Sequence, residues 1–371
     1  MPLVTLDQIR PYAKPMVDRV KAGTMPPWYS DKCCGQFSPE HTLTREEISA
    51  IEAWVSSGMP EGKKKDAPKP VKWEEQWRID GPSVVVSLPR AFDVPANAQI
   101  PDQFVILPLD LAEDKWASAV EIHPGDRSVV HHAVLYVRSK DSPWLREVPK
   151  LTMFAAGNAV EPSLQPGVDI LTVYSAGSPA SIWPEGAGKK LPAGSDLVLQ
   201  IHYEGKRTST TDRTSVGINF LKERPEKRVL TFVLQDRDFK IPPGAADFKA
   251  SIAAVLPRDL YLVDMLPHMH LRGAGFELSV SLPGGVRPET LIDSRGYDSV
   301  WQQSYPLKAP RFLPKGTRLV WTATFDNSEK NWRNPNSKAE VHWGEQSTAE
   351  SMTAYFDVAV DVNVERIAAR P

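Results

Sequence analysis

Five of the chain's eight histidines gather in three short, strand-like segments. These segments are VHHA at residues 130–133, LQIHY at 199–203 and PHMH at 267–270. Neutral imidazole is the most common protein ligand of transition metals. The clustering therefore indicates metal binding, and the different spacing within the segments indicates two metal sites rather than one.

The spacing of the histidines sets which of them can share an ion. His268 and His270 are two residues apart, so in a strand they point to one face and can hold one metal together. His131 and His132 are adjacent and point to opposite faces, unless a strand end or a bulge redirects one ring. His202 is the natural third ligand for that pair. The alternative for His202 is an ordinary core or edge histidine that bonds a backbone carbonyl.

The donor atoms limit the identity of the metal. Sites with nitrogen donors alone suit zinc, copper, iron or nickel, whereas a thioether donor selects copper(I). Met352 lies in a strand-like segment near the C-terminus and is the candidate sulfur ligand for the His268/His270 pair. Its alternative role is core filling, as for most methionines in strands. The other histidines, which we expect to be ordinary surface residues, are His41, His123 and His342.

The elements that must position these residues change in type along the chain. Residues 1–60 read as helical, with capping-box patterns at 5–8 and 44–47, and residues 61–80 form a Lys/Pro-rich linker. Short β-rich runs then alternate with Pro/Gly turns, which is typical of sandwiches or barrels. We expect a mainly β fold with two tandem antiparallel β-sandwich (jelly-roll-like) domains at 81–224 and 225–371, behind a short helical segment.

Bulk composition narrows the class of partner. The 371-residue chain has a formal net charge of −2 with mixed signs throughout, so it has no electrostatic footprint for nucleic acid or an anionic membrane. It has no apolar stretch near the roughly 20 residues that a membrane helix requires, so we expect no transmembrane segment. No secretory signal opens the sequence, and we expect the amino terminus to be truncated. Cys33 and Cys34 are adjacent and cannot link distant strands.

Taken in this order, the segments VHH, LQIHY and HxHLRG, with a closing ExM strand, resemble the copper type II ascorbate-dependent monooxygenases. This is the family of peptidylglycine hydroxylase and dopamine β-hydroxylase, and the chain is most similar to bacterial members with a cytochrome c-like domain in front. The likeness covers most of residues 80–360. It implies two copper ions, one in each sandwich, facing each other across an open cleft. It also implies a periplasmic or secreted protein.

The resemblance assigns roles to the histidines. His131, His132 and His202 would bind the electron-transfer copper, while His268 and His270, with a methionine, would bind the copper that meets O2 and substrate. The family reaction inserts one oxygen atom into a C–H bond of a small organic substrate. Electrons come from ascorbate or another one-electron donor such as a cytochrome. Gln200 lies on the same strand face as His202, where we expect it to orient a ring or a water.

Several features of the chain depart from the family pattern. Glu350 and Tyr355 fix a register that puts Ser351 at the ligand position and Met352 one residue on, facing away unless a bulge intervenes. Leu266 replaces the arginine with which peptide-processing members bind a carboxylate, which favours a more apolar substrate. Met25 resembles an axial haem ligand, but no Cys-x-x-Cys-His segment precedes it. Haem c is therefore expected only in a longer natural form, and otherwise Met25 packs between helices.

Two other functions stay open at this point. One is a copper-binding electron-transfer protein that has lost oxygen chemistry at the second site, which the serine at position 351 favours. The other is a zinc-stabilised β-sandwich binding module without redox activity.

Overall fold

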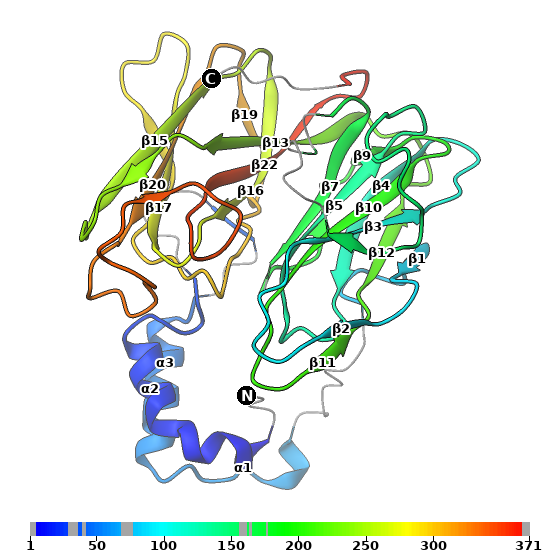
Figure 1. Cartoon of the computed structure of the whole chain (residues 1–371). Coiled ribbons are helices and arrows are strands. Elements are labelled where there is room, and N and C mark those ends of the chain that lie inside the picture. Colours follow the sequence, from blue (N-terminus) through cyan, green and yellow to red (C-terminus); the bar gives the residue numbers. More distant parts are fainter. Residues whose placement is uncertain are drawn as a thin grey trace.

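The computed structural model describes residues 5–28, 36–38, 42–67, 77–155, 162, 165–175 and 177–365. The chain is mainly β, with two sandwiches behind a short helical segment, which confirms the predicted fold class (Figure 1). Cys33, Cys34 and His41 lie outside the described residues. None of the helices among the described residues is long and apolar enough to cross a bilayer.

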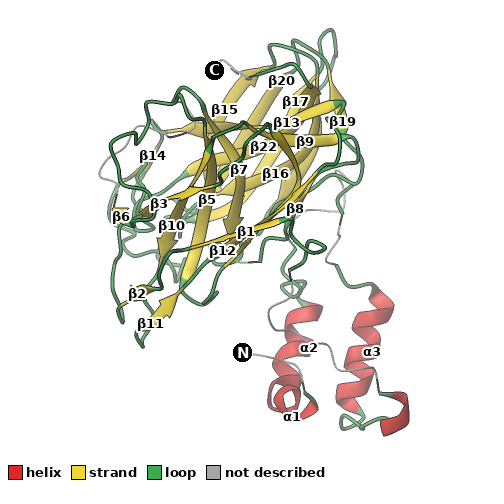
Figure 2. Cartoon of the chain, turned by 90° about the vertical axis from the view of Figure 1, so that its right-hand side faces the viewer, coloured by secondary structure: helices red, strands yellow, loops and turns green. Residues whose placement is uncertain are grey.

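Two capping boxes start the helices of the N-terminal segment. The hydroxyls of Thr5 and Thr44 accept the backbone N–H of Gln8 and Glu47, whose side chains accept the threonine N–H groups in return. Figure 2 shows the helices below the sheets. The helices are α1 (Leu6–Ile9), α2 (Ala13–Lys21) and α3 (Arg45–Ser56), with 3₁₀ turns at Arg10–Tyr12 and Lys64–Asp66.

The first sandwich packs a five-stranded sheet against one part of a nine-stranded sheet. In spatial order the five strands are β6 (Phe154–Ala155), β3 (Gln103–Pro108), β10 (Asp196–Tyr203), β5 (Val130–Arg138) and β7 (Val168–Ser175). The facing part of the larger sheet holds β1 (Val84–Ser87), β12 (Ser215–Phe220), β4 (Lys115–His123) and β9 (Ala187–Leu191), with β8 (Ser181–Ile182) paired to β4. A ribbon of β2 (Phe92–Val94) and β11 (Thr210–Asp212) completes this half.

The second sandwich uses the other part of the same large sheet. Its strands are β13 (Lys227–Asp236), β22 (Met352–Asp361), β16 (Leu260–His268) and β19 (Arg311–Leu313). They pack on a sheet of β15 (Phe248–Val255), β20 (Arg318–Phe325), β17 (Gly273–Ser281) and β18 (Glu289–Ser294), and β14 (Lys240–Ile241) pairs with β21 (Val341–His342). Because β9 lies parallel to β13, the sheet continues across the expected boundary between residues 224 and 225.

Side-chain alternation gives the five-stranded sheet two buried faces. Leu135 and Leu199 point into the core of the first sandwich, whereas Val134, Tyr136 and Val198 point outward into a smaller apolar cluster. Partly buried Val233 and Tyr355 of the second sandwich pack against this outer cluster. The outer face of the first sandwich is therefore covered by β13 and β22. The candidate site lies at the end of this contact.

Candidate metal centre

A bulge in β5 allows two adjacent histidines to reach the same place. His132 lies opposite His202 on β10, and the next pair along is Val130 with Tyr203, so His131 is the extra residue. The Nδ1 atoms of His131 and His132 are 3.1 Å apart. The condition that the sequence imposed, a bulge that redirects one ring, is met in the structure.

A carboxylate fixes the orientation of His202. The rings of His202 and His132 stack in parallel with centroids 4.9 Å apart. His202 Nδ1 donates to Asp102 Oδ1 at 2.7 Å, while Gln200 Nε2 donates to Asp102 Oδ2 at 2.6 Å. Tyr136 in turn donates its hydroxyl to Gln200 Oε1 at 3.0 Å. With Nδ1 protonated toward the carboxylate, Nε2 of His202 is left as the lone-pair donor for a metal.

The second histidine pair lies at the end of β16. The rings of His268 and His270 are 5.2 Å apart between centroids, as their two-residue spacing predicts. His268 Nδ1 donates to Gln302 Oε1 at 2.7 Å, which leaves its Nε2 for a metal. Nδ1 of His270 is buried and has no hydrogen-bond partner within the part of the chain that the structure describes. A buried imidazole nitrogen without a partner fits a metal ligand.

Glu350 holds the chain at His270 from behind. This buried carboxylate accepts the backbone N–H groups of His270 and Arg272, the latter at 2.9 Å. Arg272 is itself buried and donates from Nε to Asn327 at 3.0 Å. Burial raises the pKa of Glu350 to about 7, although three backbone N–H groups and the Arg272 guanidinium favour the charged form. The loop that carries His270 is therefore fixed by buried polar contacts.

The two groups of histidines meet, which corrects the expectation of an open cleft between them. The rings of His132 and His268 are 5.3 Å apart between centroids. The five imidazoles therefore form one continuous cluster. The physical reason is the contact between the outer face of the five-stranded sheet and the strands β22 and β16, which brings His132 and His268 to facing positions.

The prediction of Met352 as a metal ligand is wrong. Met352 is fully buried in the core of the second sandwich, while its neighbours Ser351 and Thr353 line the pocket beside the histidines. The pairing of β13 with β22 is regular from Lys227 opposite Asp361 to Asp236 opposite Met352, so no bulge turns the methionine around. Strand alternation therefore keeps its sulfur on the core side.

Burial sets the charge state of the rings. It lowers the pKa of His268 to about 4, and it lowers the pKa of His132 and of His270 well below the usual histidine range. The pKa of His131 is also lowered by burial, against an opposing effect of Glu204. These imidazoles are neutral at pH 7, which is the form that binds a metal.

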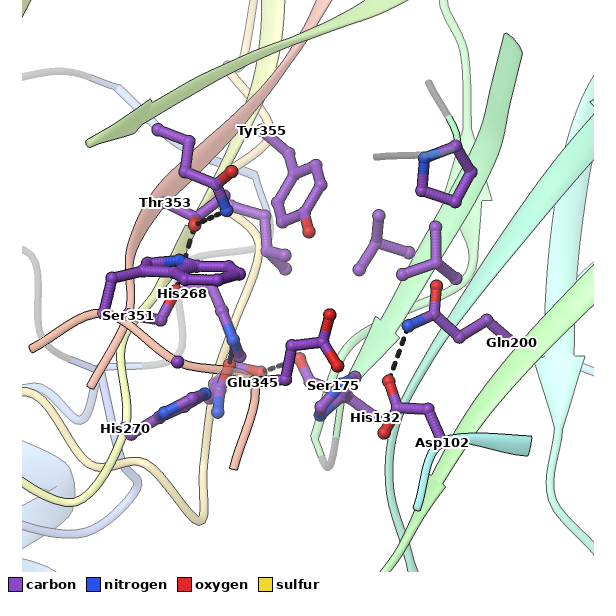
Figure 3. A pocket seen from close by; sticks show the side chains of 18 of the residues that line it. Asp102, His132, Ser175, Gln200, His268, His270, Glu345, Ser351, Thr353 and Tyr355 are labelled. Atoms are coloured by element: carbon purple, nitrogen blue, oxygen red, sulfur yellow. Dashed lines mark hydrogen bonds between the residues drawn. The ribbon is translucent and has the colours of Figure 1, made fainter. Parts of the chain in front are cut away.

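A pocket of about 110 Å³ opens beside the cluster. Figure 3 shows its two walls, with Asp102, Gln200 and His132 on one side and His268, Ser351 and Tyr355 on the other. Leu266 also lines the pocket, on the face of β16 that carries His268. Its apolar lining is completed by Phe104, Val134, Val173 and Trp343. The pocket is sized for a small molecule.

The remaining predicted residues lie elsewhere. Met25 is 49% exposed and lines a separate cavity, so it does not pack between two helices. His342 is exposed, as expected, with its Nε2 3.0 Å from Glu340. His123 was expected at the surface but is half-buried, with its ring 5.2 Å from that of Trp77.

Three residues at the site were not predicted to act there. Asp102 and Gln302 orient His202 and His268, and Glu204 joins His131 and His202 in a group whose ligand atoms lie within 4.8 Å of one another. Asp102 belongs to a second such group with His132 and His202. Asp102 directly precedes β3, whose first residue Gln103 pairs with Ile201. Only this strand pairing would have identified it.

No protein-family model and no curated protein matches the chain. The solved structures similar to this chain include PNGF-II, at 9% identity and TM-score 0.34. The alignment covers 75% of this chain and 65% of PNGF-II. The major capsid protein P2 of bacteriophage PM2 aligns at 8% identity and TM-score 0.30 over 74% of this chain and 96% of that one. PNGase F, a glycosylasparaginase from Flavobacterium meningosepticum, aligns at 11% identity and TM-score 0.27 over 79% of this chain and 94% of that one.

Proposed function

We propose that this chain is a copper-dependent monooxygenase that inserts one oxygen atom from O2 into a C–H bond of a small organic substrate. The observation that carries the proposal is the cluster of five imidazoles at one end of a small, partly apolar pocket. Electrons would come from ascorbate or another one-electron donor. The family resemblance of the sequence motifs agrees with this chemistry.

The donor atoms fit copper. His131, His132 and His202 would hold one ion, and His268 with His270 would hold a second. Imidazole nitrogen suits both oxidation states of copper. When bound, copper would supply one-electron transfer and the activation of O2 for attack on the C–H bond. Asp102 and Gln302 fix the ring orientation and tautomer of His202 and His268, so that Nε2 of each ring is directed to a metal.

The pocket wall supports an apolar substrate. Leu266 occupies the position at which a carboxylate-binding arginine would be required for a C-terminal peptide, and its side chain lines the pocket. Phe104, Val134 and Tyr355 extend the wall away from the histidines. These side chains would contact the apolar part of a small substrate, while Arg237 and Glu345 in the same lining offer it charged groups.

Copper content and oxygen uptake test the proposal. We expect two copper ions per chain by elemental analysis after loading and dialysis, and ascorbate-driven O2 uptake that His202→Ala and His268→Ala each reduce by at least 100-fold. His342→Ala, at the exposed histidine, is the matched control and should leave both measurements unchanged. A copper content of zero, or a clear preference for zinc without redox activity, would refute it.

One observation favours a second function, a copper-binding electron-transfer protein without oxygen chemistry. Ser351 faces the pocket where a thioether would be required, because Met352 points into the core. The second ion would then have only His268 and His270 as side-chain ligands from its own sandwich. Such a protein would accept and donate electrons but would show no ascorbate-driven O2 uptake, and the same assay separates the two functions.

A further inference from the structure

Glu204 lies beside the first group of histidines, on the same strand face as His202. It directly follows β10, and the backbone stays extended there, because Glu204 bridges to Gln99 and its N–H donates to the Val129 carbonyl at 2.9 Å. Side chains two residues apart in an extended strand point to one face. Glu204 and His202 are therefore directed to the same side of the sheet.

The two carboxylate oxygens of Glu204 face different partners. Oε1 lies 3.9 Å from His131 Nε2, and Oε2 lies 3.4 Å from Lys206 Nζ. The side chains of Glu204 and Lys206 are 34% and 48% exposed, so their ion pair stabilises the fold only weakly. The pair with Lys206 leaves Oε1 directed to the histidines.

The spacing of the donor atoms fits a single ion. One atom from each of His131, His202 and Glu204 lies within 4.8 Å of the other two. Nitrogen and oxygen ligands bind about 2.0–2.2 Å from an ion such as zinc, so two ligands of one ion are at most about 4.4 Å apart. The 3.9 Å between His131 and Glu204 lies inside this limit. Small side-chain shifts therefore bring all three atoms onto one ion.

A hydrogen bond orients the ring of His131. Its Nε2 donates to the Ser299 carbonyl at 3.1 Å, so this edge of the ring is fixed on the side where Glu204 lies. A neutral imidazole can carry its proton on either nitrogen. When the proton moves to Nδ1, Nε2 can exchange the contact with Ser299 for a bond to an ion.

We propose that Glu204 is a further ligand of the ion that the proposed function assigns to His131, His132 and His202. The identity of this ion as copper rests on the proposed function, whereas the binding of a divalent ion by Glu204 does not. A carboxylate is a harder ligand than imidazole and favours copper(II) over copper(I). Glu204 therefore lowers the reduction potential of this ion relative to a site with imidazole ligands alone.

The test uses the full chain with His268→Ala and His270→Ala, which removes the second histidine pair, and copper(II) as the probe. In this background Glu204→Gln should alter the copper(II) electron paramagnetic resonance spectrum. It should also weaken copper(II) binding at least about tenfold and change copper(I) binding by less than about threefold. A tenfold loss for copper(II) alone raises the reduction potential by about 59 mV. The matched control is Glu289→Gln, at an exposed acid 2.7 Å from Arg311, which should change neither measurement.

A second variant separates coordination from a simple effect of charge. Lys206→Gln removes the neighbouring positive charge and should leave the spectrum unaltered. The urea midpoint of Glu204→Gln without added metal should equal that of the wild type, because the side chain is partly exposed. An unaltered spectrum in Glu204→Gln would overturn the inference, whatever the change in affinity, because a ligand cannot be replaced without changing the spectrum of the bound ion.

The same variants separate this inference from the proposed function. If the wild-type chain consumes O2 with ascorbate but Glu204→Gln retains the unaltered spectrum, only the assignment of this ligand fails. If Glu204→Gln changes the spectrum but the wild-type chain shows no O2 uptake, only the proposed function fails. If the chain binds zinc and no copper, the proposed function fails, and Glu204→Gln should then weaken zinc binding at least about tenfold. Zinc binding that Glu204→Gln leaves unchanged would overturn both.

Discussion

Asp102 provides a sharp test of how the metal centre is oriented. Its two carboxylate oxygens accept Nδ1–H of His202 at 2.7 Å and Nε2–H of Gln200 at 2.6 Å, and its side chain is only 12% exposed. In Asp102→Asn, the new amide oxygen can still accept His202, but its NH2 group then faces the NH2 group of Gln200. One of the two hydrogen bonds must break, and little solvent is present to replace it.

The expected loss of copper affinity follows from the poorer orientation of the His202 ring. Removing the partner of a metal-binding histidine typically lowers metal affinity about 10–100-fold, which corresponds to about 1.4–2.7 kcal/mol. This range agrees with the roughly 1.5–3 kcal/mol of a hydrogen bond to a charged group. We expect the copper(II) dissociation constant of Asp102→Asn to rise by that factor. The free energy of unfolding of the metal-free protein should also fall, by about 1–3 kcal/mol, because the broken hydrogen bond leaves a buried polar group without a partner.

Competition with a chromogenic copper chelator measures the affinity. The matched control is Asp93→Asn, at an exposed acid on β2, which should bind copper as the wild type does. A double variant, Asp102→Asn with Gln200→Glu, restores donor and acceptor matching, since the introduced carboxylate accepts both from the introduced amide and from the Tyr136 hydroxyl. It should recover at least half of the lost binding free energy. An Asp102→Asn affinity within twofold of wild type would refute the reasoning.

Three further predictions concern β22, the serine that precedes it, and β16. Met352→Leu conserves volume in the core and should cost less than about 1.5 kcal/mol in urea unfolding with no change in copper content; loss of one copper would show that the sulfur is a ligand after all. Ser351→Met adds a thioether on the pocket face and should raise copper(I) affinity about tenfold in a chelator competition, and unchanged affinity would show that the side chain does not reach the metal. Burial and the neighbouring Asp357 raise the pKa of Asp264, so the folded state retains a proton that the unfolded state releases above about pH 3.9. The stability contributed by this group therefore falls as pH rises from about 4 toward the raised pKa. Asp264→Asn should reduce that fall and stabilise the protein at pH 7, as measured by the urea midpoint at several pH values, with Asp93→Asn as the control. An unchanged pH dependence of the midpoint in Asp264→Asn would contradict this prediction.

Local sequence rules were sufficient to predict where the helices begin and which side chains share a strand face. The threonine caps at residues 5 and 44 predicted where helices begin, because the capping hydrogen bonds are made within four residues. Period-two alternation put His268 and His270 with Leu266 on one face, and the adjacency of His131 and His132 required the bulge that β5 contains. The same alternation predicted that Met352 faces away from the pocket unless a bulge intervenes, and β22 has none.

Only the tertiary structure decided which faces meet. The contact of His132 with His268 depends on the outer face of one sandwich packing on strands of the other, and no local pattern encodes that packing. The partnership of Asp102 with His202 arises from strand pairing across 100 positions of sequence. The sequence by itself thus determined which residues can bind a metal, since donor chemistry and strand period are local properties. The fold decided that they form one cluster, because long-range packing of sheet faces sets the distances between them.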